Sequence, residues 1–175
     1  IDHPDKTNFV NLDFKISEGD ISRINRIYFI GNNYFDKNEL FSEIKSKQDN
    51  FFLIFRNANF KKYQIKNDVN MLSNLYKDNG FRNIKVTYKT EYISSKNTFN
   101  VYFYVNEGLL YNFSQFHTDT QITNINLDQI DHINNIVNDY YSKKISKKNF
   151  YNESKINKLT EIISDYLYDI GLIFF

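Results

Sequence analysis

Residues 100–108 read NVYFYVNEG, and residues 11–19 read NLDFKISEG. Large apolar residues recur at every second position in both stretches. Both stretches end in Glu-Gly, and the two Glu-Gly steps are 89 residues apart. Alternation of this kind is typical of a half-buried strand, and Gly allows the turn that ends it. The match therefore predicts that one folding unit of this period is used more than once.

A second match along the chain supports this period. It pairs a helical apolar stripe and the Gly after it with a later stripe and its Gly, and the two glycines are 91 residues apart. The paired positions are Leu72 with Ile163, Leu75 with Tyr166, Tyr76 with Leu167 and Gly80 with Gly171. Because tandem arrays of small modules usually present extended binding surfaces, the repeat favours binding over catalysis.

The region between the two Glu-Gly steps reads as one complete unit. Alternating apolar residues predict strands at 24–30, 84–92 and 99–105, with a turn at 94–97. A helix is predicted from Asp36, which forms a capping box with Glu39, to about Lys47. A longer helix is predicted over residues 61–79, with Gly80 at its C-terminus. The order β-α-α-β-β indicates an α+β fold whose last two strands form a hairpin.

The flanking regions read as parts of the same kind of unit. We expect residues 9–19 to be the last strand of a truncated preceding module, residues 22–107 a complete module, and residues 109–175 a module truncated before its closing hairpin. In this last module, Tyr111, Phe113 and Phe116 indicate a first strand. Two helix faces follow, formed by Ile130, Ile133 and Val137 and by Ile156, Leu159, Ile163 and Leu167.

Composition argues against several functional classes. The chain has 22 basic and 21 acidic residues, a net charge of +1, and no Cys, which excludes disulfides, thiolate metal sites and cysteine nucleophiles. His3, His117 and His132 are far apart, and no phosphate loop, nucleophile elbow or dinucleotide fingerprint is present. No catalytic residue, metal or cofactor is therefore predicted.

No signal peptide opens the chain, and no apolar run approaches the roughly 20 residues of a membrane-spanning helix.

Two features allow a different interpretation. The many Tyr and Phe side chains could stack on single-stranded nucleic acid. The lysines at 143, 144, 147 and 148 could contact phosphate or lipid headgroups, although a solvated linker is the simpler interpretation. The nearly neutral charge disfavours a nucleic-acid partner, and the spacing of the aromatics favours core positions.

Short motifs in the complete unit resemble the POTRA domain family. Residues 24–35, INRIYFIGNNYF, are similar to that family's first strand and Gly-Asn turn, and residues 75–81, LYKDNGF, are similar to its helix-to-strand corner. The aromatic insertion at 51–55, FFLIF, and Tyr63 resemble the third POTRA module of the BamA family. On this alignment residues 9–18 end the second module, 22–107 form the third and 109–175 begin the fourth. The sequence TDT at 118–120 departs from the pattern, because a Gly-Asn turn would recur there.

The resemblance implies both a fold and a role. Each module would be a three-stranded mixed sheet covered by two helices on one face. POTRA modules of the BamA family form the arm, on the periplasmic side of the Gram-negative outer membrane, of a barrel that assembles outer-membrane proteins. The implied partners are BamB-like accessory lipoproteins and unfolded outer-membrane protein clients, with membrane contact only through a C-terminal barrel outside this chain. The alternatives are a related secretion or translocation barrel and a static cell-envelope scaffold.

One predicted strand is a candidate partner-binding site. If the first strand lies beside the last, the strand at 84–92 is left at the sheet edge, where unpaired N–H and C=O groups can accept an extended chain. The candidate residues are Ile84, Lys85, Val86, Thr87, Tyr88, Lys89, Thr90, Glu91 and Tyr92. The competing interpretation is that Lys85, Lys89 and Glu91 protect this edge from aggregation.

The two Glu-Gly steps are candidate joints between modules. The joint residues are Glu18, Gly19 and Asp20 at the first step and Glu107, Gly108 and Leu109 at the second. Each Glu is expected to have a structural role there, and each Gly to allow a change of angle, so the arm is expected to flex.

Overall fold

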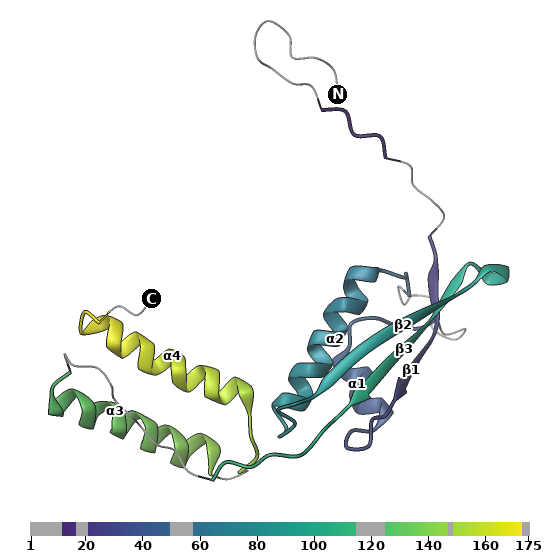
Figure 1. Ribbon diagram of the computed structural model, residues 1–175. Coiled ribbons are helices and arrows are strands. Elements are labelled where there is room, and N and C mark those ends of the chain that lie inside the picture. The colour runs from purple at the N-terminus through teal and green to yellow at the C-terminus, as the bar shows by residue number, and fades with distance from the viewer. Residues whose placement is uncertain (1–11, 17–20, 50–57, 115–124, 147–148, 173–175) are drawn as a thin grey trace, which may run out of the picture.

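The computed structural model describes residues 12–16, 21–49, 58–114, 125–146 and 149–172. Its first folded unit contains β1 (Arg23–Ile30), α1 (Lys37–Glu43), α2 (Lys62–Lys77), β2 (Lys85–Ile93), the short 3-10 helix η1 (Ser94–Lys96) and β3 (Thr98–Asn106) (Figure 1). The predicted order β-α-α-β-β is therefore confirmed for this unit.

The three strands form one sheet in the order β1-β3-β2. β1 runs parallel to β3, from Arg23 opposite Thr98 to Ile30 opposite Tyr104, with a register shift between Ile24 and Arg26. β2 runs antiparallel to β3, with Lys85 opposite Asn106 and Ile93 opposite Thr98. The sheet is mixed, as predicted, and the last two strands form the predicted hairpin.

The core lies between one face of this sheet and the two helices. Alternate residues of the strands point toward the helices, as the two-residue period of a strand requires. The buried cluster is Ile24, Ile27, Phe29, Leu40, Ile44, Ile65, Leu72, Tyr76, Phe81, Ile84, Val101, Phe103 and Val105. Because α1 and α2 both contribute to it, they cover the same face of the sheet, and the prediction of two helices on one face is confirmed.

The start and the end of α1 have separate causes. Asp36 accepts hydrogen bonds from the amides of Asn38 and Glu39, and the Glu39 side chain accepts one from the Asp36 amide, so the predicted capping box is present. The helix ends at Glu43, not near Lys47 as predicted. The amides of Lys45 and Ser46 instead donate to the buried carboxylate of Asp68 on α2, at 2.9 and 3.1 Å.

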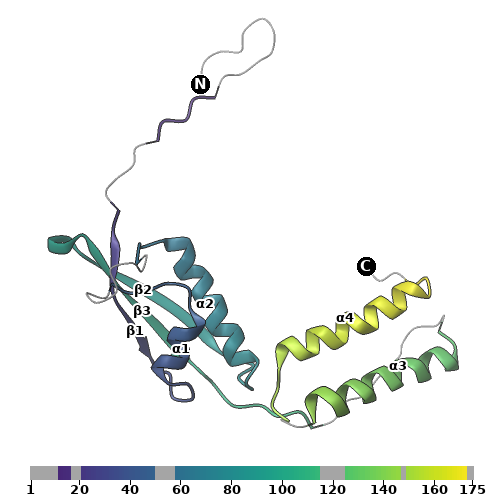
Figure 2. The same cartoon turned by 180° about the vertical axis from the view of Figure 1, so that it is seen from behind.

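The second folded unit consists mainly of two helices. α3 (Leu127–Tyr140) continues into a π-helical turn, η2 (Tyr141–Ile145), and α4 (Glu153–Asp169) runs beside α3 (Figure 2). Their facing sides bury Ile133, Val137, Leu159 and Leu167, all of which lie on the predicted helix faces. Within the described part of this unit, the expected first strand is reduced to an isolated bridge between Asn112 and Phe150.

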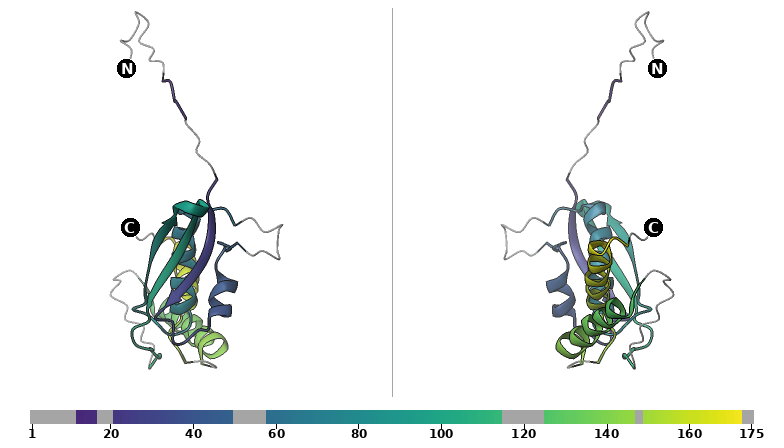
Figure 3. Two further views of the ribbon diagram at one scale, coloured as in Figure 1. Left: turned by 90° about the vertical axis from the view of Figure 1, so that its right-hand side faces the viewer. Right: turned by 90° about the vertical axis from the view of Figure 1, so that its left-hand side faces the viewer.

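Residues 12–16 stand apart from both units in every view (Figure 3). They form no strand, and Leu12, Phe14 and Ile16 are 76%, 84% and 82% exposed. The expected half-buried strand at 9–19 is thus not formed by its described residues. The physical reason is that a strand needs a neighbour to bond to, and no described strand lies beside this segment.

Candidate partner-binding edge and module joint

β2 is the open edge of the sheet. β3 lies on one side of it, and within the described part of the chain no other backbone or side-chain group bonds to its backbone. The strand begins at Lys85, one residue later than predicted. Ile84 lies in the preceding turn, where its amide donates to the carbonyl of Phe81 at 3.2 Å, and its side chain is buried in the core.

The opposite edge, formed by β1, is covered along its first half. The amide of Ile24 donates to Ala58 O at 2.8 Å, and the carbonyl of Ile24 accepts from the Asp49 amide at 2.7 Å. The amide of Ile27 donates to the side chain of Gln48 at 3.0 Å. An extended chain therefore finds free backbone groups more readily along β2 than along β1.

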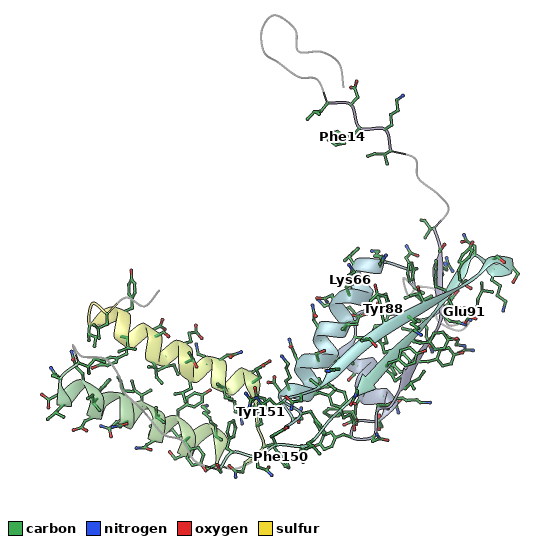
Figure 4. The ribbon with its side chains drawn as sticks, viewed as in Figure 1. Phe14, Lys66, Tyr88, Glu91, Phe150 and Tyr151 are labelled. Atoms are coloured by element: carbon green, nitrogen blue, oxygen red, sulfur yellow. The ribbon has the colours of Figure 1, made fainter. Side chains whose placement is uncertain are left out.

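The two faces of β2 differ in chemistry. Val86 and Tyr88 point toward α2 and are half-buried against the core, whereas Lys85, Thr87, Lys89 and Glu91 point to the other face and are exposed. Figure 4 shows Tyr88 on the side of the strand nearest α2 and Glu91 farther along toward the hairpin turn. From Lys89 to Tyr92 the strand is exposed on both faces, and Tyr92 is 53% exposed.

Glu91 takes part in a hydrogen-bond network on the helix-free face. Its Oε2 atom accepts from Tyr102 Oη at 2.8 Å and from Asn100 Nδ2 at 3.1 Å, and Asn100 Oδ1 accepts from Asn25 Nδ2 at 2.8 Å. The bonds from Asn100 and Tyr102 lower the pKa of Glu91 and hold it as a carboxylate. This network connects all three strands across their exposed face.

Glu107, one of the predicted joint residues, holds its own module together. Its Oε1 atom accepts from the amides of Asn33 and Tyr34 at 2.7 and 2.8 Å, and from Tyr76 Oη at 3.0 Å. It thereby ties the end of β3 to the turn after β1 and to α2. Gly108 adopts a positive φ of 69°, and Leu109 is 71% exposed. Glu18, Gly19 and Asp20 lie outside the described residues.

The contacts across the joint come mainly from residues that the sequence did not single out. At the end of α2, Asp78 accepts from the amide and the hydroxyl of Ser154 at 2.9 and 2.6 Å, and its carbonyl accepts from Asn152 Nδ2 at 2.7 Å. Lys77 forms an ion pair with Glu153 at 2.9 Å. These bonds connect the C-terminal end of α2 to the N-terminal end of α4, where Asn152 is also the capping residue.

The linker between the units is fixed as well. The amide of Tyr111 donates to Gly80 O at 2.8 Å, and its hydroxyl accepts from Asn83 Nδ2 at 2.9 Å. The Tyr111 carbonyl accepts from the amide of Tyr151, and the guanidinium of Arg82 lies 5.9 Å from the Tyr151 ring. These contacts would break if the angle between the two units changed freely. They therefore favour a fixed orientation of the two units over the flexible joint expected from Gly108 alone.

No other kind of site emerges from the described residues. They contain no group of three or more His, Cys, Asp or Glu side chains arranged to hold a metal ion. Among them no helix combines the length and the apolar character needed to cross a membrane. The aromatic insertion at 51–55 lies outside the described residues, whereas Tyr63 lies on α2 with its side chain 67% exposed.

Comparison with known proteins identifies relatives of this arrangement. The family model described as POTRA, surface antigen variable number repeat, matches residues 22–108. The outer membrane protein assembly factor BamA of Buchnera aphidicola subsp. Acyrthosiphon pisum (strain APS) is 29% identical over an alignment of 170 residues, and the match covers 93% of this chain and 26% of that protein. This chain therefore spans about a quarter of the length of the curated relative it matches.

A solved structure shares the fold. The crystal structure of Haemophilus influenzae BamA POTRA3-5 superposes with a TM-score of 0.59 at 17% identity, and the match covers 85% of this chain and 55% of that one. This similarity supports the arrangement of two consecutive units, the first of which has the β-α-α-β-β order.

Proposed function

Because this chain belongs to the POTRA domain family through residues 22–108, we propose that it is a segment of the periplasmic arm of a BamA-like outer-membrane assembly factor. In that role it binds its partners and does not transform them. The aligned relative is named as an assembly factor, and the alignment runs through both folded units and not only through the matched domain.

The proposed binding site is the free edge of β2. A client of an assembly factor for barrels is an extended chain with alternating side chains, and such a chain can pair with the unbonded N–H and C=O groups of Lys85–Ile93. Backbone pairing depends little on side-chain identity, so one edge can accept many clients. The observation that carries this proposal is the strand order β1-β3-β2, which leaves β2 at the edge while β1 is partly covered.

Side chains next to the edge would give a modest preference for certain residues in the added strand. An added strand would place alternate residues beside Val86 and Tyr88, which are half-buried, and the others beside Lys85 and Lys89, which are exposed. Apolar residues at the positions beside Val86 and Tyr88 would extend the core past β2. This pattern matches a strand with one apolar and one polar face, which is the pattern of a barrel strand.

The same edge is the proposed contact for an accessory lipoprotein of the assembly complex. A folded partner can donate an edge strand of its own, so clients and a BamB-like lipoprotein would compete for the same backbone groups. The contacts made by Asp78 and Lys77 would keep the next module at a fixed angle, so that β2 is presented to both partners in a constant orientation.

A static scaffold is the second candidate function. The observation that favours it is the charge on β2, since Lys85, Lys89 and Glu91 are all exposed on one face of the edge. Charged side chains on an edge commonly prevent the addition of another strand. In that case partners would bind as folded domains elsewhere on the surface, and β2 would stay unpaired.

The test is an NMR titration of the ¹⁵N-labelled chain with a ten-residue peptide in which Phe, Val and Tyr alternate with Thr and Ser. Strand addition predicts amide shifts along Lys85–Ile93 and few elsewhere. The control is the same peptide with every amide N-methylated, which keeps the side chains but removes the backbone donors on both edges. Absence of shifts at millimolar peptide, or equal shifts with the methylated peptide, would contradict strand addition and favour the scaffold.

A further inference from the structure

The helix-free face of the sheet carries a cluster of aromatic side chains that the strand-addition proposal does not use. Tyr28 on β1 and Tyr102 on β3 are stacked with their ring centroids 4.9 Å apart and their planes 11° from parallel. Tyr104 and Ile30 lie opposite each other in the next register position on the same face. We call Tyr28, Ile30, Tyr102 and Tyr104 the tyrosine patch; Tyr28 and Ile30 are 41% and 44% exposed.

The patch is held in one conformation by its neighbours. Tyr102 Oη is bonded to Glu91, which is bonded in turn to Asn100, and Asn100 accepts from Asn25. The ammonium of Lys89 lies 5.7 Å from the centroid of the Tyr104 ring. Side chains that are already ordered lose little conformational entropy on binding, and Tyr is among the residues that contribute most to protein interfaces.

The charge around the patch is mainly positive. Arg26, Lys85 and Lys89 lie on this face, and within the described part of the chain none of them has a carboxylate at ion-pair distance. The carboxylate on the face, Glu91, already accepts two hydrogen bonds. The chain as a whole has a net charge of only +1, so this excess is a local property of the face.

We propose that the helix-free face of the sheet is a docking surface for a protein partner that presents an aromatic or aliphatic anchor flanked by carboxylates. The anchor would lie on the tyrosine patch, and the carboxylates would pair with Arg26, Lys85 and Lys89. Charge complementarity selects this occupant, because a basic or neutral segment would leave the three cations unpaired. This contact uses side chains on all three strands, so it differs from backbone pairing along β2.

The test uses the whole chain and three peptides of equal length: acetyl-EWEEWE-amide, acetyl-QWQQWQ-amide and acetyl-KWKKWK-amide. Ring resonances of Tyr28, Tyr102 and Tyr104 are followed by NMR. The proposal predicts that the acidic peptide shifts these rings and binds about tenfold more weakly when NaCl is raised from about 0.05 to about 0.5 M, because salt screens exposed charges. It also predicts little response to the neutral peptide and none to the basic one.

Charge reversal provides the matched variants. Lys85→Glu with Lys89→Glu should weaken binding of the acidic peptide at least tenfold, whereas Lys62→Glu with Lys66→Glu, an equal charge change on α2, should change it less than twofold. All four lysines are exposed, and circular dichroism checks that both variants fold. Equal binding of the three peptides, equal effects of the two double variants, or shifts confined to the β2 amides with Tyr28 unmoved would overturn the proposal. The last result would leave strand addition at β2 intact.

Discussion

The hydroxyl of Tyr76 donates a hydrogen bond to Glu107 Oε1 at 3.0 Å, joining the middle of the core to the end of the last strand. Tyr76 is fully buried on α2, and the same carboxylate oxygen accepts from the amides of Asn33 and Tyr34. The Glu of the repeated Glu-Gly step therefore closes the module, because it fastens three segments that are distant in sequence.

Replacing Glu107 should destabilise the first unit. Glu107→Ala removes the acceptor of three donors, one of them the buried Tyr76 hydroxyl, and should lower the free energy of unfolding by about 2–3 kcal/mol. Urea denaturation followed by near-ultraviolet circular dichroism measures this. Glu161→Ala, which removes an exposed ion pair on α4, is the control and should change stability by less than about 0.5 kcal/mol. Equal effects of the two variants would contradict the role given to Glu107.

Alkaline pH should weaken the first unit through Tyr76. Burial, and then the hydrogen bond to Glu107, raise the pKa of the Tyr76 phenol above its ordinary value of 10.0. Above about pH 10 the unfolded chain loses this proton while the folded chain keeps it, so the unfolding free energy falls as pH rises. Below about pH 10 this contribution is fully present.

The variant Tyr76→Phe isolates this effect from that of the other tyrosines. It should cost about 1 kcal/mol at neutral pH, because one hydrogen bond is lost while two donors to Glu107 remain. Its unfolding free energy should then fall less steeply than that of the parent above about pH 10. Parallel stability curves between pH 8 and pH 11 for the two proteins would rule out the assignment.

Gly31 should tolerate no side chain. It has a φ of 88°, and a Cβ atom there would overlap the carbonyl oxygen of Val105. Gly31→Ala should destabilise the unit by about 3 kcal/mol or more, from backbone strain and overlap together. Gly108→Ala is the matched control. It also has a positive φ, but its Cβ would lie 3.7 Å from Asn83 O, an ordinary contact, so it should cost about 1 kcal/mol. Thermal unfolding that ranks the two variants in the opposite order would refute this explanation.

The joint between the units should loosen when the contacts of α2 with α4 are removed. Lys77→Ala with Asp78→Ala deletes the ion pair to Glu153 and both bonds to Ser154, so the two units should stay folded but sample a wider range of angles. Small-angle X-ray scattering should show a larger radius of gyration or a broader distance distribution. Asp139→Ala with Lys143→Ala removes an ion pair within one unit and should leave the profile unchanged. An unchanged profile for the joint variant would mean that other contacts fix the angle.

Local features of the fold could be predicted from the sequence. The capping box of Asp36 and Glu39, the apolar stripe of α2 and the alternation in β3 depend on neighbours within a few residues, and each appears as predicted. The strand order could be predicted only conditionally, since it depends on whether β1 lies beside β3. The structure supplies that pairing and thereby places β2 at the edge.

Long-range polar contacts could not be predicted. Asp68 lies between Ile65 and Leu72 on the apolar stripe of α2, and a carboxylate at such a position indicates that it has a buried hydrogen-bond partner. The sequence does not show that its partners are the amides of Lys45 and Ser46. The bonds from these two amides to Asp68 end α1 early. The contacts of Asp78 with Ser154 could not be predicted either, because they depend on how two units are placed relative to each other.

Amide hydrogen exchange in β2, measured with and without the alternating peptide, tests strand addition at this edge most directly. Successive residues of a strand point their N–H groups to opposite sides, so those of Lys85–Ile93 point alternately to β3 and to the free edge. If an extended chain adds to β2, the peptide should slow exchange at every second residue of this strand, at the outward amides, and leave the outward amides of β1 unchanged. Exchange in β2 that stays the same at saturating peptide, or protection that appears along β1 instead, would contradict it.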